Sequence, residues 1–457
     1  RNRIMLKRLS ICYVLFILCT TCVSAQEDRW TGSATNLSKG NLRVNSSGRY
    51  LEYTDGTPFL YLGDTAWELI SRLNDKETER YLENRREKGF TVIQTVILDE
   101  LDGINTSSNG VPQLIDGNID QPSPEYFARV DKVISLAATK GLYIALLPTW
   151  GDKVDKQWGK GPEIFTPENA YRYGKWLGER YMNMPNLIWV IGGDRSGGGK
   201  NLSIWNALAT GIKSIDQNHL MTYHPQGEHS SSYWFHDAPW LDFNMCQSGH
   251  AQQDFAIYQR ILLPDLNRKP HKPCMDGEPR YENIPINFKK ENGRFGEDDV
   301  RHTLYQSMFS GACGYTYGCN DIWQMFDTGR ESKCDADTPW HQAMDKQGAW
   351  DLIHFRRLWE KFDFTQGKSQ QSIFGNASLE KTNYPVAFGN KDYILVYLPQ
   401  GGKRTIYLPP MSSPKQTLKW MNPRNGQTTF YQYTTTDTIS ISSPTEGKGN
   451  DWVLIIE

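Results

Sequence analysis

The sequence has no surplus of positive charge. It carries 50 Lys and Arg against 52 Asp and Glu, which gives a formal net charge of −2. Proteins that bind nucleic acids present a basic face to the phosphates, so no nucleic-acid partner is expected. Hydrophobic residues make up 38% of the chain and charged residues 22%, and these values are typical of a globular protein.

Cysteine is scarce, with eight residues in 457. Five of them follow the first 25 residues: Cys246, Cys274, Cys313, Cys319 and Cys334. An odd number leaves at least one thiol unpaired, although Cys313 and Cys319 are close enough in sequence to form a bridge. No CxxC pair occurs among the five, and the histidine spacing fits no standard metal motif, so neither a metal nor a cofactor is expected.

Long apolar runs are missing after the N-terminus. Residues 1–8 hold four basic side chains, residues 11–18 are apolar, and Val23-Ser24-Ala25 offers small residues for cleavage. This order is typical of a signal peptide, and the apolar run is too short to span a bilayer. We therefore expect a secreted or periplasmic protein without membrane insertion. A lipoprotein anchored through Cys19 or Cys22 is the less favoured alternative.

Aromatic residues, in contrast, are abundant, with 15 Trp, 23 Tyr and 18 Phe. Flat rings pack well against the C–H faces of sugars, but large cores bury the same residues. Both interpretations stay open for each individual ring.

Short apolar runs alternate with amphipathic helical stretches from about residue 58. The eight runs are residues 59–64, 90–95, 142–147, 187–194, 219–224, 241–246, 273–278 and 314–318. Ser123-Pro124 and Thr166-Pro167 are typical helix starts after the second and third runs. Eight strand–helix units predict an α/β fold, a closed (β/α)8 barrel. A doubly wound open sheet is the competing topology, but the first loop lacks its glycine-rich fingerprint.

The pattern changes near the C-terminus. Residues 370–457 contain short alternating runs such as 392–398, 404–408 and 452–456, separated by turns such as Asn425-Gly426. This pattern predicts a small antiparallel β-sandwich. The expected organisation is a signal peptide at 1–25, a catalytic barrel at 26–365 and a sandwich at 366–457. The sequence shows no repeat and no low-complexity linker, so the two domains should pack firmly together.

The active site of a (β/α)8 barrel lies at the carboxyl ends of its strands, and this rule selects candidate residues. Carboxylates, amides, histidines and tryptophans gather at these positions, a set that suits an oligosaccharide or polysaccharide. The side chains selected for substrate binding are Asp64, Trp67, Gln94, Trp150, Arg195, His224, Gln247, His250, Tyr281, Glu282, Tyr317 and Trp323.

Cleavage of a glycosidic bond needs two carboxyl groups on either side of it. Asp194 ends the fourth run and Glu278 ends the seventh, on opposed parts of an eight-stranded ring. We predict Asp194 as the general acid/base and Glu278 as the nucleophile, held ionised by Arg195 or Arg280. Either carboxylate could instead cap a helix, and Glu282 is the rival nucleophile.

Two other motifs fail on inspection. Residues 192–200 resemble a phosphate-binding loop, but Asp194 stands where the first glycine belongs and Asn201 replaces the required Ser or Thr. We expect this segment to form a loop over the site. The G-x-S-x-G motif of serine hydrolases is absent.

Several stretches resemble glycoside hydrolase family 140, the apiosidase-type barrels, and related bacterial barrels. They include Gly63-Asp64-Thr65-Ala66-Trp67, the Trp189 to Asp194 stretch, Gly277-Glu278-Pro279-Arg280-Tyr281-Glu282 and the Gly449 to Leu454 ending. The resemblance covers nearly all of the chain after residue 25. The C-terminal domain of this group has been labelled as collagen-binding.

The resemblance implies cleavage of the bond between apiose and galacturonic acid in rhamnogalacturonan II, a plant pectin, by a Bacteroidetes-type enzyme. It also places the acid/base at Asp194 and the nucleophile at Glu278. Many related barrels carry Asn-Glu on the fourth strand where this chain has Gly193-Asp194. The alternatives are a glycosidase of another sugar specificity and a non-catalytic glycan-binding protein. A monomer is expected.

Overall fold

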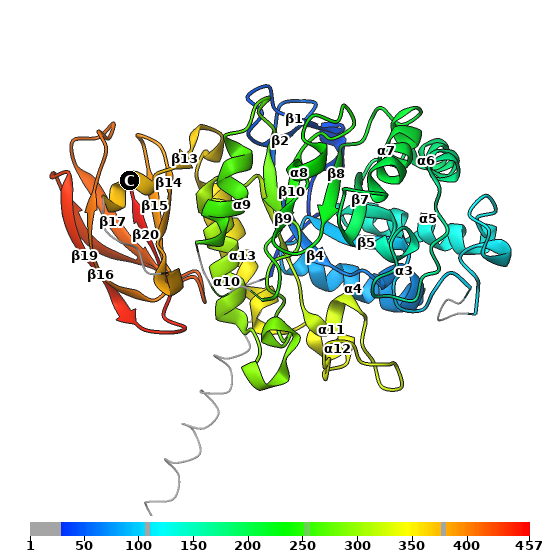
Figure 1. Ribbon diagram of the computed structural model, residues 1–457. Helices are drawn as coiled ribbons and strands as arrows, with labels where there is room; N and C mark the ends of the chain where they lie inside the picture. The colour runs from blue at the N-terminus through cyan, green and yellow to red at the C-terminus, as the bar shows by residue number, and fades with distance from the viewer. Residues whose placement is uncertain (1–28, 106–109, 252, 254–255, 376–380) are drawn as a thin grey trace, which may run out of the picture.

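The protein folds as a (β/α)8 barrel with an antiparallel sandwich beside it, which confirms the predicted fold class (Figure 1). The computed structural model describes residues 29–105, 110–251, 253, 256–375 and 381–457. The predicted signal peptide, residues 1–25, lies outside the described residues.

Eight parallel strands form the barrel wall, each close to one of the predicted apolar runs. They are β4 (Tyr61–Thr65), β5 (Val92–Leu98), β6 (Tyr143–Thr149), β7 (Leu187–Arg195), β8 (Met221–Pro225), β10 (Asn244–Gln247), β11 (Cys274–Asp276) and β12 (Gly314–Tyr317). Seven parallel pairings join neighbouring strands in the order β8, β7, β6, β5, β4, β12, β11 and β10. Between β8 and β10, the Asp242 N–H donates to Met221 O (2.9 Å) and Thr222 Oγ1 donates to Phe243 O (2.6 Å). The short β9 (His229–Ser230) pairs antiparallel with β10.

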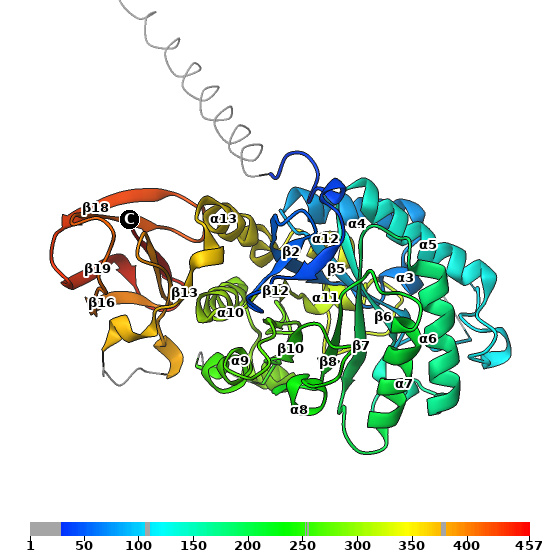
Figure 2. The same cartoon turned by 90° about the horizontal axis from the view of Figure 1, so that it is seen from above.

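Helices follow the strands and cover the outside of the barrel (Figure 2). The longer ones are α4 (Asp75–Glu87), α5 (Pro124–Thr139), α6 (Pro167–Tyr181), α7 (Asn201–Lys213), α9 (Ile257–Leu266), α10 (Glu297–Ser310) and α13 (Gln347–Lys361). The short ones are α3 (Leu69–Arg72), α8 (Ser232–Phe235), α11 (Asn320–Trp323) and α12 (Trp340–Ala343). Ser123 and Thr166 cap α5 and α6, as the sequence predicts, because each side chain accepts a free N–H of the first turn.

A three-stranded sheet closes the amino-terminal end of the barrel. It consists of β1 (Leu42–Val44), β2 (Leu51–Tyr53) and β3 (Pro58–Phe59). Its buried side chains Leu51, Tyr53 and Phe59 join one apolar cluster with the barrel interior, which reaches Trp67 and Trp150 at the opposite end. The barrel is therefore a packed core with an opening only where its loops leave space.

The C-terminal domain consists of two antiparallel sheets. Six strands pair in the order β13 (Lys368–Ser369), β14 (Val386–Gly389), β15 (Ile394–Leu398), β20 (Trp452–Ile456), β17 (Gln416–Met421) and β18 (Thr428–Thr434). The second sheet pairs β16 (Gly401–Tyr407) with β19 (Thr438–Glu446). Alternate residues of β15 face opposite sides, so Ile394 and Val396 fill the sandwich core while Leu395 and Tyr397 join the core of the barrel.

The larger sheet packs against α10 and α13, which lie between the sandwich and the barrel strands in both views (Figures 1 and 2). The rings of Tyr305 and Tyr397 stack at 4.7 Å across this contact. Beside them Arg301 of α10 binds Asp351 of α13 (2.5 Å) and Asp451 of the sandwich (3.0 Å), all fully buried. The two domains thus share one core and one ion cluster.

The five cysteines in the described part of the chain are unpaired. The suggested bridge between Cys313 and Cys319 does not form, because the extended strand β12 runs between the two residues and holds them apart. Among the described residues, no helix has the length and apolarity needed to cross a membrane.

Candidate active site

A cavity of about 1040 Å³ opens at the carboxyl ends of the barrel strands. Asp194 and Glu278 both line it, together with rings from several loops. Six of the predicted substrate-binding residues also lie in its wall: Trp67, Trp150, Gln247, His250, Tyr281 and Trp323. Their location agrees with the barrel rule, and their contact with substrate stays a prediction.

An irregular end of β7 presents Asp194 to the cavity. The pairing of β7 with β8 shifts register between Gly192 and Arg195, where the backbone φ of Gly192, Gly193 and Asp194 is positive (94°, 127° and 55°). Positive φ costs little for glycine and more for aspartate, so the surrounding structure must hold Asp194 in place. The Asp194 N–H donates to His224 Nδ1 (3.3 Å), which provides part of that support.

A tight turn after β11 presents Glu278. The buried Asp276 carboxylate accepts the Glu278 N–H (3.2 Å), the Ser248 hydroxyl (2.6 Å) and the Tyr258 hydroxyl (2.6 Å). Gln94 Nε2 donates to Gly277 O (2.9 Å) from the second strand of the barrel. These bonds fix the backbone on both sides of the turn, so the Glu278 side chain has a defined direction.

Two histidines contact the Glu278 carboxylate. His250 Nε2 lies 2.9 Å from Oε1, and His224 Nε2 lies 3.0 Å from Oε2. His224 accepts the Asp194 N–H at Nδ1, so the same ring contacts both carboxyl-bearing residues. Burial opposes ionisation of Glu278, but the histidine contacts outweigh it and lower its pKa to about 2. The sequence suggested Arg195 or Arg280 for this role, whereas Arg280 pairs with Asp299 (3.8 Å).

Asp194 has the opposite electrostatic environment. Burial and the negative charge of Glu278 raise its pKa to about 6, although His224 and Arg195 act in the other direction. The two carboxyl groups therefore differ in proton affinity, and near pH 5 one is protonated while the other is ionised. An acid and a carboxylate in one cavity are the groups that glycosidic cleavage requires.

Aromatic rings surround the pair. Trp67 and Trp150 pack together (5.0 Å between centroids), and both contact the His224 ring. Tyr281 packs against His250 (4.4 Å). Only a small part of each ring faces the cavity, and the rings keep the two histidines in a fixed orientation.

The structure does not bring six of the predicted substrate-binding residues to the cavity surface: Asp64, Gln94, Arg195, His224, Glu282 and Tyr317. Asp64 forms a buried ion pair with Arg85 (2.9 Å), and Glu282 accepts the Tyr317 hydroxyl (2.7 Å) beneath α13. These placements set the six residues apart from the cavity wall, and their predicted contact with substrate and the rival role of Glu282 stay predictions. Gln94, Arg195 and His224 act instead from behind the wall, through the contacts with Gly277, the loop after β6 and Glu278.

Sequence reasoning missed several loop residues in the wall: Glu100, Trp158, Lys160, Glu228, His229, Phe288 and Lys333. Loops carry no hydrophobic period, so position relative to the strand ends was the only available signal. Trp158 lies in the loop between β6 and α6 and could have been selected by that rule. Glu100 lies just after β5, and burial with the nearby Asp194 raises its pKa to about 8.

Two groups of described side chains bring three metal-ligand atoms within 4.8 Å of one another: Glu68 with Asp99 and Asp102, and Asp298 with Asp299 and His302. In the first group, Asp102 binds the Arg72 guanidinium through both oxygens (2.7 and 2.8 Å). Asp99 accepts the backbone N–H groups of Asp102 and Gly103. These bonds already satisfy most of the oxygens a cation would need.

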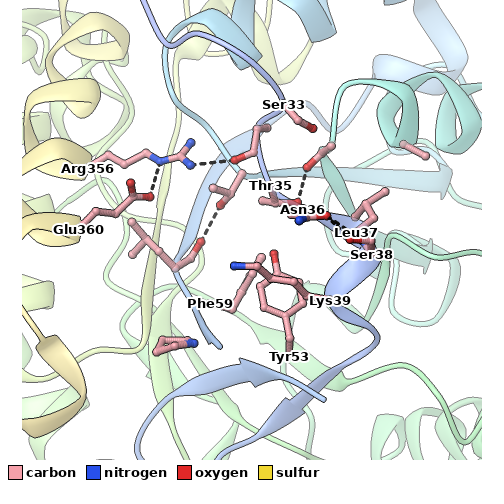
Figure 3. A pocket seen from close by; sticks show the side chains of 16 residues that line it. Ser33, Thr35, Asn36, Leu37, Ser38, Lys39, Tyr53, Phe59, Arg356 and Glu360 are labelled. Atoms are coloured by element: carbon pink, nitrogen blue, oxygen red, sulfur yellow. Dashed lines mark hydrogen bonds and ion pairs between the residues drawn. The ribbon is translucent and has the colours of Figure 1, made fainter. Parts of the chain in front are cut away.

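A second cavity, of about 600 Å³, lies at the opposite end of the barrel (Figure 3). Its polar groups bind one another: Arg356 binds Glu360 (2.8 Å) and Ala34 O (2.8 Å), and Thr35 Oγ1 donates to Gly141 O (2.6 Å). This network ties the segment before β1 to the barrel and offers no pair of carboxyl groups like the first cavity. The cavity at the carboxyl ends is therefore the candidate active site.

Comparison with protein families gives two matches. Residues 45–366 match the model described as "Apiosidase-like, catalytic domain". Residues 369–457 match the model described as "Putative collagen-binding domain of a collagenase". The first match includes both Asp194 and Glu278.

Solved structures resemble the chain over nearly its whole length. One, titled "Glycoside hydrolase", is 35% identical with a TM-score of 0.84, and the alignment covers 92% of this chain and 97% of the other. A glycoside hydrolase family 5 protein from Bacteroides vulgatus ATCC 8482 is 32% identical with a TM-score of 0.85, and 92% and 94% are covered. A comparison with curated proteins finds no significant match.

Proposed function

Since the chain belongs to the apiosidase-like family of glycoside hydrolases, we propose that Asp194 and Glu278 are its catalytic acid/base and nucleophile. The observation that carries this proposal is the contrast between the two groups in one cavity. The Asp194 pKa is raised to about 6, while the Glu278 pKa is lowered to about 2. An acid must hold its proton at the pH where the nucleophile is charged, and this pair meets that condition.

The proposed reaction has two steps. Asp194 gives its proton to the glycosidic oxygen while a Glu278 oxygen attacks the anomeric carbon, and the electrons of the breaking C–O bond pass to the leaving oxygen. The Asp194 carboxylate then takes a proton from water, whose oxygen attacks the anomeric carbon and releases Glu278. The anomeric configuration is retained over the two displacements.

For the substrate we propose the linkage between apiose and galacturonic acid in rhamnogalacturonan II. The family match supports apiose. Lys160 and Lys333 in the cavity wall support an acidic sugar beside it, because their ammonium groups can bind a uronate carboxylate. The signal-peptide pattern of residues 1–25 supports action outside the cytoplasm, where pectin fragments are found.

The first test is product analysis by chromatography on rhamnogalacturonan II and a panel of aryl glycosides. We expect wild type to release apiose, and Asp194→Ala and Glu278→Ala to lose at least about 10³-fold of the activity on the natural linkage. NMR of the first product reports the anomeric configuration. Tyr433→Ala, which removes a largely exposed ring of β18 in the sandwich, is the control and should keep full activity.

Other products separate the parts of the proposal. Release of another sugar would replace the substrate and keep the two carboxyl roles. Binding of glycans without any product, or full activity in both alanine variants, would overturn the catalytic assignment.

A further inference from the structure

The indole of Trp158 contacts the proposed acid directly. Trp158 belongs to the loop between β6 and α6, and its side chain is 49% exposed in the cavity wall. Its Nε1–H donates to Asp194 Oδ2 (3.1 Å), while the Arg195 guanidinium lies 4.2 Å from the centre of its ring. The Trp158 ring thus contacts both Asp194, the proposed acid, and Arg195, the next residue in the chain.

Arg195 holds the loop that carries Trp158. Its buried guanidinium donates to three carbonyl oxygens of that loop, Asp155 O (2.7 Å), Lys156 O (2.9 Å) and Trp158 O (2.5 Å). It also donates to Asp194 O (2.9 Å). Five N–H groups in a rigid plane make arginine suited to this clamp, and a carboxylate or lysine could not replace it.

The loop is fixed at further points. The Gly161 N–H donates to Asp152 Oδ2 (2.7 Å), and the Lys156 N–H donates to Glu163 Oε1 (2.8 Å). The indole N–H therefore stands at a defined position before substrate arrives. A preformed donor costs no reordering during the reaction.

An indole N–H only donates, so the oxygen that it binds must act as an acceptor. Arg195 Nη1, another donor, lies 3.9 Å from the same Oδ2. A proton on Oδ2 would face both donors and weaken the bond to Trp158, because a carboxylic hydroxyl oxygen is a poorer acceptor than a carbonyl oxygen. A proton on Oδ1 would leave that bond intact.

We propose that Trp158 is a positioning residue that holds Asp194 Oδ2 as an acceptor and keeps the transferable proton on Oδ1. This inference rests on the proposed role of Asp194 as the acid. Arg195 sets the position of Trp158 by holding its loop against β7. This arrangement explains why Arg195, the residue after Asp194, is buried and does not line the cavity.

The test is Trp158→Phe, which keeps a ring and removes only the N–H donor. Its rates are measured on two aryl glycosides of the sugar that wild type releases, one with phenol and one with 2,4-dinitrophenol as leaving group. Phenol needs protonation as it leaves and 2,4-dinitrophenol does not. All rates in this test are compared as kcat/KM, which reports the first step, because kcat also contains the second step, in which Asp194 acts as the base. We expect kcat/KM to fall about 10- to 100-fold on the phenyl glycoside and to stay within about threefold on the dinitrophenyl glycoside.

The pH profile supplies a second measurement. Loss of a donor to a carboxylate destabilises the charged form, so the basic limb of kcat/KM should move to higher pH in Trp158→Phe. Trp452→Phe is the matched control, because it removes an indole bond of the same kind, to Thr445 Oγ1 (2.9 Å), in the sandwich. It should change neither the leaving-group dependence nor the pH profile.

Asp194→Ala on the same two substrates separates the two possible failures. If Asp194→Ala loses rate mainly on the phenyl glycoside and Trp158→Phe loses rate equally on both or on neither, the positioning role is wrong and the acid assignment stands. If Asp194→Ala shows no such selectivity, the acid assignment itself fails. A Trp158→Phe variant that melts at the wild-type temperature ensures that neither result reflects unfolding.

Discussion

At the scale of single residues, the proposed mechanism requires two carboxyl groups that carry opposite protonation states. Glu278 has to be ionised, which holds above its pKa of about 2, and Asp194 has to be protonated, which holds below its pKa of about 6. We therefore expect kcat/KM to be highest at mildly acidic pH and to fall about tenfold per unit above pH 6. Initial rates between pH 3 and pH 9 give this profile.

A fall of kcat/KM that begins at a different pH would identify a different acid. Glu100 lies in the same cavity with its pKa raised to about 8, so a profile that falls only above pH 8 would point to Glu100 and contradict the role of Asp194. The Glu100→Gln variant distinguishes the two, since it should leave a limb near pH 6 in place.

The residues that sequence reasoning placed correctly are those that strand ends specify. Asp194 and Glu278 end apolar runs, and barrel geometry alone brings such positions to one mouth. Asp64 ends a run in the same way, yet it pairs with Arg85, which lies on α4. No local pattern marks that partner. An acidic residue at a strand end can therefore belong to the site or to a buried ion pair, and only the tertiary contacts distinguish the two. The rule could have placed Trp158 near the mouth, but its contact with Asp194 depends on the tertiary bonds of Arg195.

At the scale of elements, the irregular end of β7 decides where the acid lies. A Cβ on Gly193 would lie 2.9 Å from Gly151 N and 3.0 Å from the Trp150 ring, at a φ of 127° that other residues rarely adopt. We expect Gly193→Ala to lower kcat at least about tenfold and to cost about 1–3 kcal/mol of stability. Steady-state kinetics and urea denaturation measure the two effects.

Gly199→Ala is the control for that prediction. Gly199 also has a positive φ (61°), but no atom lies within 4 Å of its added Cβ, and it follows the acid by five residues. It should lose some stability and keep kcat. Equal loss of kcat in both variants would mean that backbone strain in general, and not the position of Asp194, limits the rate.

The elements themselves were largely predictable. The eight apolar runs correspond to β4 to β8 and β10 to β12, and the two Ser/Thr-Pro helix starts correspond to α5 and α6, because periodicity and capping are local properties. The short β9 was not predicted. The three-stranded sheet before β4 was not predicted, since its strands are three residues long or shorter and their pairing depends on contact with the barrel floor.

At the scale of the whole molecule, the buried ion cluster at the domain contact should be sensitive to the loss of any one member. Asp451 binds both Arg301 (3.0 Å) and Arg424 (3.1 Å), and Arg301 would lose its contact with the sandwich without it. We expect Asp451→Ala to cost about 3–5 kcal/mol, because it leaves a buried guanidinium partly uncompensated. Thermal and urea unfolding measure the loss.

An exposed pair provides the comparison. Asp120 binds Arg172 (2.7 Å) on the barrel surface, where both side chains remain largely open to water. Asp120→Ala should leave the melting temperature unchanged. If Asp451→Ala is equally silent, the ion cluster contributes nothing measurable and the shared apolar core alone holds the domain contact.

The six-stranded sheet has a consequence for the history of this architecture. Both of its faces are apolar, one toward β16 and β19 and one toward α10, so neither domain could be copied into another gene without exposing half of a shared core. Accessory domains on flexible linkers spread by recombination. This sandwich should instead be inherited together with its barrel, and substitutions on one side of the shared core should be accompanied by substitutions on the other. The two solved structures that resemble the chain over 92% of its length span both parts together.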